Sequence, residues 1–200
     1  MYYEKEIAGY TLSYTDKRAF YLLDDTPVPT FSALLFNKYE KKIKYAMANT
    51  ARLIPYHKSE LHAAIVKPEE GKTDFREYKN FLKYRELYAF KVTDTDVPVI
   101  LFDRDGKPIA ADIVDLIIEQ ATGVSGVIVK TQKTMDRRYL TDKVNLLAMA
   151  YEQTYGKKWD YCKCLQLHRD LRKLVALTFN PSLADDLIVQ YSARKNNAQL

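Results

Sequence analysis

The stretch that decides the fold is Val97-Pro-Val-Ile-Leu-Phe-Asp-Arg-Asp-Gly106, followed by Lys107-Pro-Ile109. Residues 97–102 form a short apolar run, which is typical of a buried strand. Asp-Gly between two apolar runs is a strong turn signal, and Pro108 with Ile109 can begin the exit from the turn. We therefore expect the chain to reverse direction at residues 103–106.

Residues 99–106 also resemble the first motif of the haloacid-dehalogenase-type phosphohydrolases, in which an apolar strand ends in Asp-x-Asp-Gly. The resemblance implies that Asp103 is a nucleophile that attacks phosphorus, that Asp105 is the general acid and base, and that Mg²⁺ neutralises the charge between them. The later motifs of the family would then fall on Thr131, Lys143, Asp185 and Asp186. We favour the turn, because Lys107 and Pro108 stand where the family has threonine.

The residue patterns on either side of this stretch predict an α+β chain. β-rich runs predict an N-terminal hairpin within residues 2–24, and alternation predicts another strand near residues 88–92. Helical spacing and capping residues predict helices over 31–53, 75–85 and 110–121 and a strand over 127–130. They also predict three last helices: one that begins at Thr134 or Asp136 and ends at residue 155, one over 161–179 and one over 182–194. Residues 59–66 fit a helix and a strand equally well. The expected fold is thus an N-terminal β-hairpin and a small mixed sheet covered by helices, with a three-helix C-terminal part.

Residues 1–200 are expected to form a single α+β domain. Residues 123–126 offer one candidate boundary, after which residues 126–200 are predicted to be basic and mostly helical. With 47% hydrophobic and 28% charged residues, the composition excludes a disordered chain. No apolar stretch approaches the roughly 20 residues that cross a bilayer, so we expect no contact with a membrane. Two cysteines in a C-x-C spacing and a start without a secretory signal predict a cytoplasmic protein, or a virion component if the protein is viral.

The positive charge is concentrated late in the chain. Residues 126–200 hold 13 Lys and Arg against 7 Asp and Glu, a net charge of +6 in a chain of formal net charge +5. Such a segment is typical of a surface for nucleic acid or an acidic protein, although a solvated helical face has the same composition. The candidate binding residues are Lys130, Lys133, Arg137, Arg138, Lys157, Lys158, Arg169, Arg172 and Lys173.

No metal site or cofactor site is predicted. Cys162, Cys164 and His168 supply only three ligands, and on the predicted helix Cys162 points away from the other two. His57 and His62 have no motif-spaced serine, cysteine or aspartate to form a catalytic triad. Phosphate-binding and dinucleotide-binding glycine motifs are absent from the sequence, so we expect no cofactor and favour a non-enzyme.

The leading functional hypothesis is a non-catalytic subunit of a larger protein assembly, such as a viral or phage structural or connector-type protein. Sixteen tyrosines suit protein interfaces, because each adds rigid apolar area with one hydrogen-bonding end. In this hypothesis the N-terminal hairpin and the C-terminal tail contact other protein subunits in a homo- or hetero-oligomer. The alternatives are a nucleic-acid-binding accessory protein that uses the basic C-terminal third, and the phosphohydrolase implied by residues 99–106.

Overall fold

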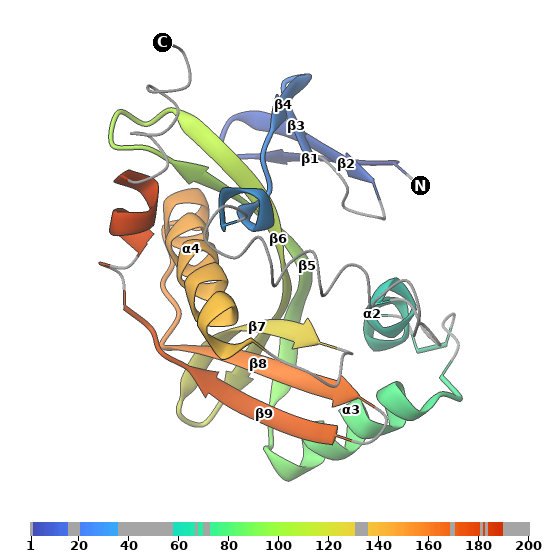
Figure 1. The fold of residues 1–200 in the computed structure, drawn as a ribbon. Coiled ribbons are helices and arrows are strands. Elements are labelled where there is room, and N and C mark those ends of the chain that lie inside the picture. Colours follow the sequence, from blue (N-terminus) through green and yellow to red (C-terminus); the bar gives the residue numbers. More distant parts are fainter. Residues whose placement is uncertain are drawn as a thin grey trace.

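A computed structural model describes residues 2–15, 21–35, 58–66, 68–69, 73–130, 136–168, 171–180, 182 and 184–189. The described chain forms two sheets, one of four strands in the order β1-β2-β3-β4 and one of five strands in the order β5-β6-β7-β8-β9 (Figure 1). The elements are β1 (Tyr2–Ile7), β2 (Tyr10–Thr15), β3 (Tyr21–Leu23), β4 (Thr26–Val28), α2 (Lys58–Val66), α3 (Arg76–Leu87), β5 (Lys91–Phe102), β6 (Pro108–Gln120), β7 (Gly123–Lys130), α4 (Arg137–Tyr155), β8 (Tyr161–His168) and β9 (Leu171–Leu177). The α+β class is confirmed.

The predicted N-terminal hairpin corresponds to the antiparallel pair β2 and β3, which belongs to a larger sheet with a further turn between β1 and β2. Ala8 and Gly9 make the turn between β1 and β2, both with positive φ. β4 is an edge strand, which is where a proline such as Pro27 is tolerated. The buried side chains of this sheet pack on Ile100, Ala111 and Ile113 of β5 and β6, so the two sheets share one apolar cluster.

The turn at residues 103–106 is confirmed. The Asp103 N–H donates to the Lys107 carbonyl at 2.9 Å, and Gly106 has a φ of 76°. One carboxylate oxygen of Asp103 accepts the backbone N–H groups of Asp105 and Lys107. The turn therefore joins β5 and β6 into a long antiparallel hairpin.

The predicted helix over residues 110–121 is wrong, because these residues belong to β6. Residues 110–118 are all buried, so no polar face alternates with an apolar one. A strand buried on both faces has no period of two, and its apolar residues can match helical spacing by chance. The predicted strand at 127–130 is confirmed within β7, which pairs with β6.

The predicted three-helix C-terminal part is also wrong, as is a mostly helical segment 126–200. α4 is confirmed, with Asp136 as its N-cap and Gly156 in the left-handed conformation at its C-cap. The predicted helix over 161–179 is instead β8 and β9, and on β8 Cys162 and Cys164 pack in the cluster under α4 while Leu165 packs in the cluster on the opposite face. Residues 182 and 184–189 are helical, and the rest of the predicted helix over 182–194 lies outside the described residues.

The helices of the N-terminal half agree in part with the prediction. Residues 31–35 are helical, and the remainder of the predicted helix to residue 53 lies outside the described part of the chain. Residues 58–66 form α2, which decides the ambiguous stretch. α3 matches the predicted helix over 75–85 and has Phe75 as its N-cap, without a side-chain cap. No helix in the described ranges is long and apolar enough to cross a membrane.

In the β5–β6 hairpin, the alternation of side chains between the two faces of the sheet shifts at Asp96 and Asp115. Before this point Val114 packs in the cluster under α4, and after it Leu116 faces α3 while Ile117 faces α4. Asp96 has a φ of 50°, an unusual conformation for a residue other than glycine. α4 thus covers one face of the five-stranded sheet, and α3 covers the other (Figure 1).

Candidate functional site

The candidate site is the fork where β6 and β7 separate. The register of the two strands ends at the pair Leu116 and Val127, and β7 continues to Lys130 beside β8. The Asp115 side chain, 3% exposed, occupies the opening and accepts the Val129 N–H at 2.7 Å. A buried carboxylate therefore lies one residue away from Lys130.

A row of three side chains crosses the sheet at the fork. Lys130 of β7 is in register with Gln166 of β8, which is in register with Lys173 of β9. Registered residues point to the same face, and this face is the one that α4 covers further along the strands. Since neighbouring strands lie about 5 Å apart, the two lysines flank Gln166 with about 10 Å between their backbones.

Two arginines on the first turn of α4 extend the positive charge. Arg137 and Arg138 are both exposed. The Arg137 guanidinium donates to the Ala176 carbonyl at 3.2 Å, which ties the start of α4 to β9. Ala176 is three residues from Lys173, or about 10 Å along the strand. Lys130, Lys173, Arg137 and Arg138 are the basic cluster of the fork.

A buried ion pair joins α4 to β6 near the fork. Lys143 Nζ lies 3.0 Å from Asp112 Oδ2, and the two side chains are 18% and 7% exposed. Lys143 also donates to Ser32 Oγ at 3.3 Å, and Ser32 Oγ is 2.8 Å from the Tyr139 hydroxyl. Asp112 in turn accepts the Phe31 N–H at 3.2 Å. This network fastens residues 31–32 and α4 to β6.

Lys143 keeps its proton throughout the neutral pH range. Burial alone would lower the pKa of Lys143, but the Asp112 carboxylate, with Tyr139 and Asp115, raises the pKa well above the usual lysine range. A lysine that stays charged cannot act as a general base. Its role at the fork is therefore that of a fixed positive charge beside Asp112 and Asp115.

The structure brings together four of the nine basic residues that the sequence singled out. Lys157 and Lys158 follow the far end of α4, about 28 Å from Arg138 at a rise of 1.5 Å per residue. Lys133 and Arg169 lie outside the described residues, and Arg172 is described only as a backbone position of β9.

The two aspartates of the phosphohydrolase motif serve the β5–β6 turn. Asp105 is exposed, and Asp103 uses a carboxylate oxygen to hold the turn together. Asp185 and Asp186 lie on the short helical stretch 184–189. Within the described ranges, no three His, Cys, Asp or Glu side chains are placed to hold a metal ion.

Cys162 and Cys164 are buried cysteines on one face of β8, and neither forms a disulfide. Burial raises the pKa of the Cys162 thiol to about 12, so it stays protonated at neutral pH. The side chain of His168, the third predicted partner, lies outside the described residues, and the helix on which it would share a face with Cys164 is a strand. His57 and the side chain of His62 are outside the described part as well.

Sequence reasoning missed Asp112 and Asp115 as site residues. Both stand inside the apolar stretch 109–118, where an ionised side chain has to find a partner on another element. That signal was present in the sequence. The identity of the partners was not, because Val129 and Lys143 are 14 and 31 positions away.

Comparison with known proteins gives little guidance. No protein-family model and no curated protein sequence matches the chain. Among solved structures, the chain is similar to a crystal structure of a protein called SSO0001, with a TM-score of 0.37 and 13% sequence identity over 78% of this chain and 71% of that one. A similarity at this level assigns neither a family nor an activity to the chain.

Proposed function

We propose that the protein binds the phosphate backbone of nucleic acid at the β6–β7 fork. The observation that carries this proposal is the cross-strand row in which Lys130 and Lys173 flank Gln166, with Arg137 and Arg138 on the adjoining turn of α4. Lysine and arginine side chains bind phosphates and release the counterions that surround them. The later third of the chain, with its net charge of +6, supplies all four of these residues.

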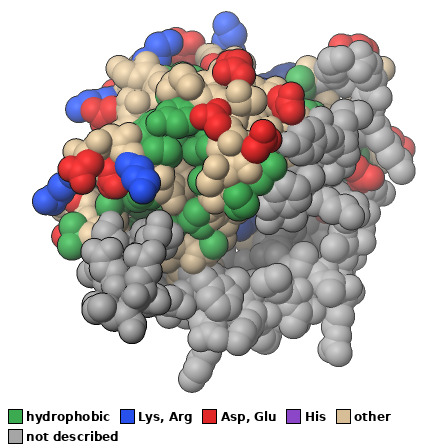
Figure 2. Space-filling model, turned by 90° about the horizontal axis from the view of Figure 1, so that it is seen from above, with side chains coloured by type: hydrophobic (Ala, Val, Ile, Leu, Met, Phe, Trp, Pro, Cys, Tyr) green, Lys and Arg blue, Asp and Glu red, His purple; other side chains and the backbone are tan. Residues whose placement is uncertain are grey.

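The position of the basic cluster supports a local site rather than a general surface charge. Figure 2 shows Lys and Arg side chains interspersed with Asp and Glu on the described part of one face of the molecule. A mixed surface of this kind produces no long-range field of one sign. Arg137 is also held by the Ala176 carbonyl, so less side-chain freedom is lost when it meets a phosphate.

Reversing the charge of two lysines tests the proposal. Lys130→Glu combined with Lys173→Glu is expected to weaken the binding of a short DNA or RNA strand and to reduce the slope of log K against log salt by about two units. The matched control is Lys107→Glu with Lys158→Glu, which changes the net charge equally but at exposed positions away from the fork. Salt titrations of fluorescence anisotropy measure the slope. Equal loss of affinity in both double variants would remove the fork as the binding site.

A second candidate, hydrolysis of a phosphodiester bond, is favoured by the Asp115 carboxylate, which accepts the N–H of Val129, the residue before Lys130. A carboxylate can help to hold a divalent cation, and a lysine stabilises the charge that develops on a phosphate. If the protein cleaves nucleic acid in the presence of Mg²⁺, Asp115→Asn is expected to abolish cleavage while salt-dependent binding persists. Absence of cleavage by the wild-type protein would leave binding as the function.

The role as a non-catalytic subunit of a larger assembly stays a prediction beside this proposal. One observation favours it, because each described sheet ends in two edge strands, β1 and β4 in one and β5 and β9 in the other. An open edge can accept a strand from another chain. Binding at the fork and assembly through the edges are compatible with one another.

A further inference from the structure

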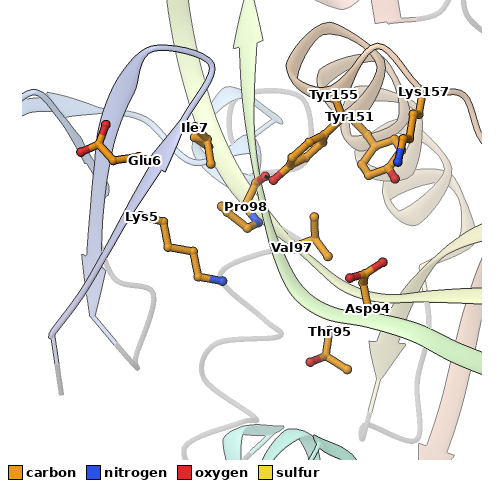
Figure 3. A pocket seen from close by; sticks show the side chains of 10 residues that line it. All are labelled: Lys5, Glu6, Ile7, Asp94, Thr95, Val97, Pro98, Tyr151, Tyr155 and Lys157. Atoms are coloured by element: carbon orange, nitrogen blue, oxygen red, sulfur yellow. Dashed lines mark hydrogen bonds between the residues drawn. The ribbon is translucent and has the colours of Figure 1, made fainter.

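A second cavity lies at the opposite end of α4 from the fork. It has a volume of about 490 Å³, is open to solvent on one side, and is lined by β1, by the part of β5 near Asp96, and by the last turns of α4 (Figure 3). This volume falls within the range of about 300–1,000 Å³ that is usual for small-molecule sites. The fork residues do not line it.

Aromatic rings form one wall of this cavity. The rings of Tyr151 and Tyr155 lie 5.1 Å apart, and Trp159 packs 5.0 Å from Tyr151. The Tyr155 hydroxyl donates to the Pro98 carbonyl at 2.7 Å, which fixes the ring against β5. Val97 and Pro98 add apolar surface between the rings and β1 (Figure 3). The rings of Tyr151 and Tyr155 are tilted by 45°, so a flat ligand ring can stack on the face of one of them.

Unused polar groups surround the aromatic wall. The Asp94 carboxylate, the Lys157 ammonium and the Tyr151 hydroxyl all line the cavity, and none of them has a hydrogen-bond or ion-pair partner among the described residues. Burial, followed by the nearby Asp94 charge, raises the pKa of Tyr151, so its hydroxyl remains a donor at neutral pH.

The other charged groups at the cavity are already engaged. Lys5 donates to the Asp96 carbonyl at 3.4 Å, a long hydrogen bond that a ligand could replace. The Glu6 carboxylate accepts the Thr11 hydroxyl at 2.6 Å, and its side chain points away from the cavity (Figure 3). Asp94 is therefore the acceptor offered to a ligand, while Lys157 and Lys5 are the cations.

We propose that this cavity binds a nucleobase together with its phosphate. The base stacks on one ring of the aromatic wall, its N–H edge donates to Asp94, and its phosphate meets Lys157. Guanine fits best, because its neighbouring ring N–H and amino group can donate to both oxygens of a single carboxylate. The site is separate from the fork, so it holds whether or not the fork binds nucleic acid.

Trp159 provides a direct readout of occupancy. It is the single tryptophan of the chain and packs against Tyr151, so its fluorescence reports on the aromatic wall. GMP is expected to give a saturable change, AMP and UMP a weaker affinity, and ribose 5-phosphate no change, because it lacks the base. Binding of ribose 5-phosphate as tight as that of GMP, or no saturable change with GMP, would overturn the proposal.

Substitutions of two exposed residues test where the ligand binds in the cavity. Asp94→Asn is expected to reduce the affinity for GMP by about tenfold or more and to remove the preference for guanine. Lys157→Ala is expected to lower the affinity for GMP. The matched control Lys158→Ala changes the adjacent position, outside the cavity lining, and is expected to leave the affinity unchanged. Equal effects of Lys157→Ala and Lys158→Ala would contradict the assignment of the phosphate.

A single strand that ends in guanine distinguishes two sources of the base, the end of a nucleic acid and a free nucleotide. Tighter binding of the strand than of GMP, reduced to the level of GMP by Lys130→Glu with Lys173→Glu, would assign the cavity to the end of a nucleic acid held at the fork. Equal affinities for the strand and for GMP, unaffected by that double variant, would assign the cavity to a free nucleotide. That result would contradict nucleic-acid binding at the fork but not nucleotide binding in the cavity.

Discussion

Replacing Lys143 with methionine is expected to lower the free energy of unfolding by about 3–5 kcal/mol, because the change leaves the buried Asp112 carboxylate without its counter-charge. The pair is 3.0 Å apart, and Asp112 is only 7% exposed at its side chain. Chemical denaturation measures the loss. Lys158→Met is the matched control, since Lys158 is exposed beyond the same helix, and it is expected to cost less than about 1 kcal/mol.

A second substitution separates lost charge pairing from lost packing. Asp112→Asn on the Lys143→Met background removes the stranded charge but keeps an oxygen for the Phe31 N–H, so the double variant is expected to be more stable than Lys143→Met alone. A double variant that is less stable would show that packing of the lysine stem, rather than the charge, accounts for the loss.

The contribution of Lys143 also has a predicted pH dependence. Its pKa is raised in the folded protein, so its stabilising effect is fully present below the unfolded lysine pKa of about 10.4 and is lost as pH rises from there towards the folded pKa. The stability difference between wild type and Lys143→Met is therefore expected to be constant near neutral pH and to shrink above about pH 10.4. A difference that shrinks on acidification to pH about 6 would contradict this account.

Gly126→Ala is expected to destabilise the fold by about 1–3 kcal/mol, and Gly126→Val by more. A Cβ atom at position 126 would lie 2.2 Å from the Trp159 ring, so the indole or β7 has to move. The Trp159 indole N–H has no hydrogen-bond partner among the described residues, and packing alone keeps the ring in place. Because Trp159 packs on Tyr151, displacement of the indole is also expected to disturb the aromatic wall of the second cavity.

Thermal melts and Trp159 fluorescence together measure the effect of Gly126→Ala. Trp159→Leu makes room at this position, so the double variant is expected to lose less than the sum of the two single variants. Strict additivity would mean that the glycine is required by the β7 backbone and not by its contact with the indole.

The local signals in the sequence predicted the features that depend on neighbouring residues. Asp103 and Gly106 predicted the turn, Gly156 predicted the end of α4, and Asp136 was one of the two predicted starts beside Thr134, because turns and caps are made by the residues beside them. The tyrosine-rich run beginning at Phe75 also formed the expected helix, with Tyr78 and Phe81 on its buried side.

The errors came from strands whose burial depends on distant elements. β6 is covered on both faces, so Ile113, Leu116 and Ile117 matched a helical stripe. The β-branched residues of that stretch favour a strand, and spacing alone does not use this signal. In β8 the alternation was visible in Cys162 and Cys164, yet the C-x-C pair was interpreted as part of a helix.

The candidate sites could be predicted only in part for the same reason. The basic residues were found by composition, but the register that places Lys130 near Lys173 required β9 to be recognised as a strand. The second cavity combines Lys5, Asp94 and Tyr151 from three elements that are far apart in the chain. No pattern of spacing in a single sequence connects them.

The order β5-β6-β7-β8-β9 places every strand beside its neighbour in the chain, and this bears on how the molecule acquires its structure. Few residues separate the partners, apart from the crossover through α4, so closing each loop costs little entropy and the sheet can grow as the ribosome releases it. The N-terminal sheet is the exception, because its partners Ile100 and Ala111 are synthesised some 90 residues after Leu12. Its docking is therefore expected to be a late, separable step of folding.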